Sequence, residues 1–121
     1  MKNLILITIL IIAIARISYA HPPSDIVAEF DTTNKILQVT VQHPVRDAQK
    51  HYISKIEIEL NGKQIIEQES SRQIDNITQK YLFIIPEAKM EDNISIEAYC
   101  SISGKKKLTS LIKQLVKKFE E

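Results

Sequence analysis

Short runs in which apolar and polar residues alternate fill most of this chain, and they constrain its fold more than any other feature. Alternation with a period of two places successive side chains on opposite faces of a β-strand. The runs lie at 26–30, 37–41, 52–60, 63–69, 78–85 and 93–100, and residues 105–109 are a candidate seventh. Because turn residues separate these runs and no helices are interleaved with them, the pattern predicts an all-β antiparallel sandwich of about seven strands.

Two of the connections carry specific signals. Asn61-Gly62 lies between two alternating runs, and a tight hairpin turn of this kind needs positive φ at both central residues. We therefore expect an antiparallel hairpin there. The unbroken apolar stretch 82–85 favours a central place in a sheet for the strand at 78–85, which Pro86 ends.

The end of the chain changes its period. Apolar residues recur at helical spacing at Leu108, Leu111, Ile112, Leu115, Val116 and Phe119. This spacing predicts a short amphipathic helix over 109–119, in a C-terminal helical tail at 110–121. We expect its apolar stripe to pack on the domain, with a partner or a membrane surface as the alternative.

Residues 1–20 have the pattern of an export signal. Lys2 is followed by an apolar run of 12 residues, 4–15, and small residues precede a cleavage position after Ala20. The run is shorter than the about 20 residues needed to span a bilayer, so no membrane span is expected after cleavage. We therefore expect a periplasmic or secreted protein with one domain, at 21–109, before the tail.

The charge balance does not favour an anionic partner surface. Loss of Lys2 and Arg16 would reduce the 16 basic residues to 14 against 15 acidic ones, so the net charge would change from +1 to −1. This balance does not favour nucleic acid as a partner. The single cysteine, Cys100, cannot form an internal disulfide, which leaves a buried thiol, an intermolecular link or a metal-bound thiolate.

The three histidines and the cysteine are expected at one end of the sandwich. If every connection reverses the chain, the segment before the first strand, the loop after the second and the turn after the sixth share an end. Those places hold His21, His43 with His51, and Cys100. Neutral imidazole and thiolate are good ligands for iron, copper and zinc, so the set predicts a metal site.

Several segments resemble the iron domain of desulfoferrodoxin and neelaredoxin, the superoxide reductases. They are His43-Pro44, His51-Tyr52-Ile53, Ile56-Glu57, Asn61-Gly62-Lys63 and Tyr99-Cys100-Ser101-Ile102-Ser103-Gly104. The similarity covers about residues 21–109. It implies an immunoglobulin-like β-sandwich and a mononuclear iron site with four imidazoles in a plane and an axial thiolate.

Carried over by position, the resemblance makes His43, His51 and Cys100 ligands of Fe²⁺, with His21 in place of a ligand near the start of the domain. The family's last imidazole has no counterpart, because Ser103 occupies that position. The implied activity is reduction of superoxide, a small anion, to hydrogen peroxide. The implied partner is an electron donor that the sequence does not identify.

Two other functions stay open from the residues alone. After cleavage, His21 would offer its amine and its ring to copper, and His43 or His51 would complete the site. Alternatively, the sandwich is a metal-free interaction module, with Cys100 in the core and the faces around Tyr52 and Tyr81 available to partners.

Overall fold

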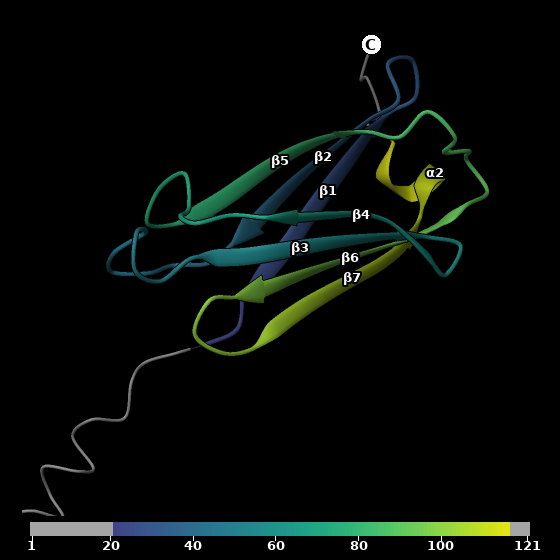
Figure 1. The fold of residues 1–121 in the computed structure, drawn as a ribbon. Coiled ribbons are helices and arrows are strands. Elements are labelled where there is room, and N and C mark those ends of the chain that lie inside the picture. Colours follow the sequence, from purple (N-terminus) through teal and green to yellow (C-terminus); the bar gives the residue numbers. More distant parts are fainter. Residues whose placement is uncertain (1–20, 117–121) are drawn as a thin grey trace, which may run out of the picture.

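A computed structural model of the protein describes residues 21–116 and shows a two-layered β-sandwich (Figure 1). The expected signal segment 1–20 and the tail residues 117–121 lie outside the described residues. One sheet has the order β1 (Asp25–Asp31), β2 (Ile36–Gln42), β5 (Thr78–Ile84). The other has the order β4 (Lys63–Glu69), β3 (Ile53–Leu60), β6 (Asn93–Cys100), β7 (Lys105–Leu111). All neighbouring strands are antiparallel, so the predicted sandwich of seven strands is confirmed.

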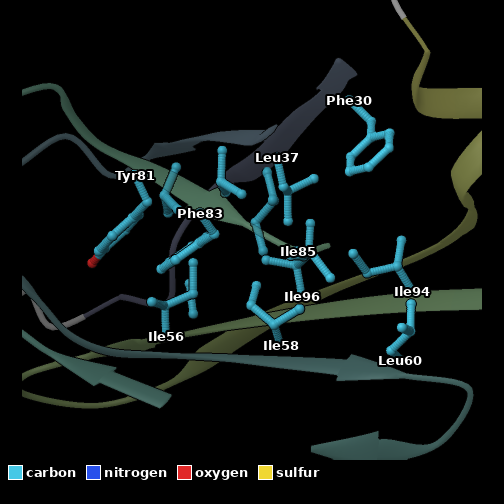
Figure 2. Close-up of a cluster of buried hydrophobic side chains, with 14 of the residues drawn as sticks. Phe30, Leu37, Ile56, Ile58, Leu60, Tyr81, Phe83, Ile85, Ile94 and Ile96 are labelled. Atoms are coloured by element: carbon cyan, nitrogen blue, oxygen red, sulfur yellow. The ribbon is translucent and has the colours of Figure 1, made fainter. Parts of the chain in front are cut away.

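The core lies between the two sheets and is built from the inward-facing members of each alternating run (Figure 2). Leu37, Ile56, Ile58 and Ile96 have side chains that are fully buried there. Burying apolar surface of this kind is the main favourable contribution to folding, and it fixes the register of each strand. Tyr81 belongs to this core as well, because it is 4% exposed and its ring stacks on that of Phe83.

The burial of Tyr81 corrects the expectation that its face is available to a partner. In β5 the residues that face inward are Gln79, Tyr81 and Phe83, as the alternating burial of the strand shows. A partner therefore has no access to this ring in the folded domain.

The hairpin predicted at Asn61-Gly62 is confirmed. Asn61 has φ 51° and Gly62 has φ 82°, the positive values that a tight turn between two paired strands requires. The turn joins β3 to β4, whose residues Leu60 and Lys63 are register partners.

The expected central position of the 78–85 strand is wrong. β5 is an edge strand that pairs only with β2 in its sheet. The side chains of its apolar stretch lie on two faces. Phe83 faces the core, whereas Leu82 and Ile84 are each 70% exposed on the outer face. The continuous apolar run therefore belongs to an edge strand whose outward-facing apolar side chains are exposed.

The tail helix is present but shorter than expected. β7 continues to Leu111, which pairs with Asn93 at the start of β6, and the helix α2 covers only Ile112–Leu115. The sheet takes residues 109–111 because β6 still offers hydrogen-bonding partners there. Ile112 is fully buried and Leu115 packs against the core, so the expected packing on the domain is confirmed for these two residues. Within residues 21–116, no helix has the length and apolar character needed to cross a bilayer.

Candidate metal centre

Four connections of the sandwich meet at one end, opposite to α2 (Figure 1, left). They are the segment before β1, the loop between β2 and β3, the loop between β4 and β5, and the turn between β6 and β7. The first carries His21, the second carries His43 and His51, and Cys100 is the last residue of β6. The predicted gathering of these residues at one end is therefore confirmed.

The three imidazoles form a compact cluster. The ring centroids lie 5.0 Å apart for His21 and His43, 5.2 Å for His21 and His51, and 4.7 Å for His43 and His51. One ring nitrogen of each residue lies within 4.8 Å of those of the other two. His43 is fully buried and the other two are half-buried, so the histidines of the loop are not ordinary polar surface.

Cys100 joins the cluster through His51. Its sulfur lies 3.0 Å from His51 Nε2, and the thiol is 8% exposed. The Ile102 backbone N–H also points to this sulfur at 3.5 Å, within the limit for a weak hydrogen bond to sulfur. The arrangement places a soft sulfur donor beside one of three nitrogen donors.

The segment that carries His21 is held by a close approach to the β6–β7 turn. A methyl carbon added at Gly104 would lie 2.8 Å from Pro22 Cβ and 2.9 Å from Pro22 Cα. Gly104 also has φ 88°, so it is suited to this position both by its backbone and by its missing side chain. Ser24 continues the attachment, because its backbone N–H donates to the Gln42 carbonyl at 2.8 Å.

Gln73 contacts His43 and was not predicted from the sequence. It belongs to the loop between β4 and β5, yet it is only 1% exposed. Its Oε1 lies in hydrogen-bonding contact with His43 Nδ1, and its Nε2 donates to the His43 carbonyl at 3.1 Å. The only sequence signal was a glutamine in a polar loop, and such residues are usually exposed.

Burial and the neighbouring rings lower the pKa of His51. Desolvation is the larger cause, and the charges that His43 and His21 would carry when protonated add to it. The lowered pKa favours the neutral imidazole at neutral pH, and the neutral ring is the form that binds metal ions.

The three imidazoles could hold a single metal ion. With metal–nitrogen bonds of about 2.0–2.1 Å, two nitrogens on one ion are at most about 4.1 Å apart, so nitrogens separated by up to 4.8 Å would have to move towards one another. Cys100 is not one of the residues whose donor atoms all lie within 4.8 Å of one another, and the 3.0 Å between its sulfur and His51 Nε2 is a hydrogen-bonding distance. Ser103 is exposed and supplies no further imidazole.

Comparison of the chain with protein-family models, curated protein sequences and solved structures gave no match.

Proposed function

We propose that the protein is an exported iron protein that holds Fe²⁺ through His21, His43, His51 and Cys100, and that it reduces superoxide to hydrogen peroxide. The observation that carries the proposal is the meeting of three imidazoles and one thiol from segments far apart in the sequence. Histidines that served only as polar surface would not be expected to lie together at one end of the domain. The sequence segments that resemble superoxide reductases include two of these histidines and the cysteine.

Iron is favoured over zinc by the resemblance of the histidine and cysteine segments to the iron domain of superoxide reductases. A bound ferrous ion would supply the one electron that superoxide needs, and two protons from solvent complete hydrogen peroxide.

The side chains have distinct parts in this proposal. The imidazoles would hold the ion and block access to it from the protein interior. His43, the most buried of the three, would lie on that inner side of the ion. The Cys100 thiolate would donate electron density, while the Ile102 N–H limits that donation. The absence of an imidazole at position 103 leaves one more coordination position for solvent or the anion.

Copper is the second candidate metal, because imidazole and thiolate also bind it. A site formed by the His21 amine and its Nδ1 has less support. Nδ1 lies 3.0 Å from the Pro22 carbonyl oxygen and donates to it, so that bond would have to break. Copper bound through His21 Nε2 would not require the bond to the Pro22 carbonyl to break.

Anaerobic titration with Fe²⁺ tests the site. We expect one equivalent to bind the wild-type protein and the variant Gln49→Ala, whose exposed side chain lies in the same loop. The double variant His43→Ala/His51→Ala should bind none, because two of three nitrogen donors are gone. Equal uptake by the wild type and the double variant would reject this loop as the site.

Oxidation of the iron-loaded protein tests the thiolate and the reaction. The oxidised protein should show a sulfur-to-iron charge-transfer band that Cys100→Ser abolishes. Addition of superoxide to the ferrous protein should give hydrogen peroxide without dioxygen. Release of dioxygen together with peroxide would indicate dismutation, and an unreacted ferrous protein would leave iron binding without the proposed reaction.

A further inference from the structure

Gln73 is a buried polar residue whose side-chain amide makes hydrogen bonds through both its oxygen and its nitrogen. Its side-chain Nε2 donates to two backbone carbonyls, those of His43 and Asp75, each at 3.1 Å. Its backbone N–H donates to the Ala48 carbonyl at 3.1 Å. These bonds join the β4–β5 loop to the loop that carries His43, so Gln73 has a fixed position beside the ring.

The two carbonyls determine which way the Gln73 amide points. A carbonyl oxygen can only accept, so the group facing the His43 and Asp75 carbonyls must be the NH₂. The amide oxygen therefore faces His43 Nδ1, as the contact between these two atoms shows. An inverted amide would lose two hydrogen bonds and place three oxygens together.

The amide oxygen in turn determines the tautomer of His43. Oε1 can only accept, so Nδ1 must carry the proton, and in the neutral ring Nε2 has the free lone pair. Nε2 lies 3.4 Å from the His21 carbonyl oxygen, which can only accept, and a ring nitrogen of His43 lies within 4.8 Å of ring nitrogens of His21 and His51. In the neutral Nδ1–H ring the Nε2 lone pair therefore faces this oxygen without a donor, and a proton or a bound cation at Nε2 would remove that mismatch.

We propose that Gln73 is the positioning residue of the candidate metal centre, because it holds His43 as the Nδ1–H tautomer and directs the unprotonated Nε2 towards the metal. The proposal rests on the proposed metal-binding function of the cluster. Partners that orient a ligating histidine through its other nitrogen typically change metal affinity by about 10- to 100-fold when they are lost.

The test compares Gln73→Met with Gln79→Met. Gln79 is also buried and holds the same loop, because its side chain accepts from the Ile74 N–H at 3.0 Å and donates to the Arg72 carbonyl at 3.3 Å, and none of its recorded side-chain hydrogen bonds is to a histidine. Titration with Co²⁺, followed by its visible absorption, should show affinity reduced by about 10- to 100-fold for Gln73→Met and an almost unchanged affinity for Gln79→Met. Gln73→Glu keeps an acceptor for Nδ1–H and should recover part of the loss.

A second measurement needs no metal. Nitrogen-15 NMR of the metal-free wild type should show a protonated Nδ1 and a bare Nε2 for His43, with Gln79→Met the same and Gln73→Met shifted towards the other tautomer. An Nε2–H tautomer in the wild type, or equal Co²⁺ affinities for the two methionine variants, would overturn the role of Gln73. If the wild type binds no Co²⁺, the proposed function fails, and the NMR result still decides whether Gln73 sets the tautomer.

Discussion

Gly104 shows at the scale of one residue how the fold supports the candidate site. Two glycines have positive φ, 82° at Gly62 and 88° at Gly104, but only Gly104 faces another segment closely. Pro22 lies where a side chain at Gly104 would be, and His21 directly precedes it. The missing side chain at Gly104 therefore permits the position of a candidate ligand.

Gly104→Ala should weaken metal binding, whereas Gly62→Ala should not. Both variants introduce a Cβ at positive φ and should lose about 1–2 kcal/mol of unfolding free energy. Only at Gly104 does the new methyl group clash with Pro22 and displace His21, since nothing lies within 4 Å of the corresponding position at Gly62. Chemical denaturation and Fe²⁺ titration of both variants measure the two effects. Equal metal affinities in the two variants would show that this contact does not position His21.

Single residues of the site were predictable to different degrees. His21, His43, His51 and Cys100 were selected as candidate ligands from their side-chain chemistry and their places between strands, and the structure brings them to one end of the sandwich. Gln73 was not, because its importance comes from burial and from contacts 30 residues away in the sequence with His43. A sequence pattern contains neither quantity.

At the scale of elements, β5 shows that a large apolar residue in a strand need not be buried. Its residues Phe83 and Leu82 are both large and apolar, yet one is 6% exposed and the other 70%. The strand lies at the edge of a three-stranded sheet, and its outer face has no covering layer among the described residues. The apolar run alone did not reveal this, because it looks the same in a strand covered on both faces.

Phe83→Ala should therefore destabilise the protein far more than Leu82→Ala. Loss of a buried phenylalanine side chain typically costs about 3–5 kcal/mol. Loss of an exposed leucine side chain should change the free energy of unfolding by about 0.5 kcal/mol or less. Urea denaturation of the two variants measures the difference. Similar losses would contradict the difference in burial between the two side chains, and a larger loss for Leu82→Ala would mean that the two faces of β5 are exchanged.

The end of β7 shows a second limit of local patterns. Residues 109–111 fit a helical period, but they pair with residues 93–95 of β6. The sheet therefore extends to Leu111. Pairing with a neighbouring strand overrode the local preference, as tertiary context often does. The helix begins at Ile112, directly after the residue that pairs with Asn93, the first residue of β6.

At the scale of the whole molecule, the number of chain reversals determines where the candidate ligands lie. Because all the strand pairs are antiparallel, the segment before β1, the β2–β3 loop and the end of β6 were expected at one end, and the structure has them there. This part of the site could be predicted without any distances. The contacts that shape it, such as the 3.0 Å between His51 and Cys100, depend on side-chain packing and could not.

The proposed function requires that these distant segments hold one metal ion jointly. X-ray diffraction from crystals of the Fe²⁺-loaded protein, collected at the iron absorption edge, tests it most directly. We predict one anomalous peak within coordination distance of a ring nitrogen of each of His21, His43 and His51 and of the Cys100 sulfur. An iron peak elsewhere on the molecule, or this cluster without iron in crystals grown with excess Fe²⁺, would contradict the claim.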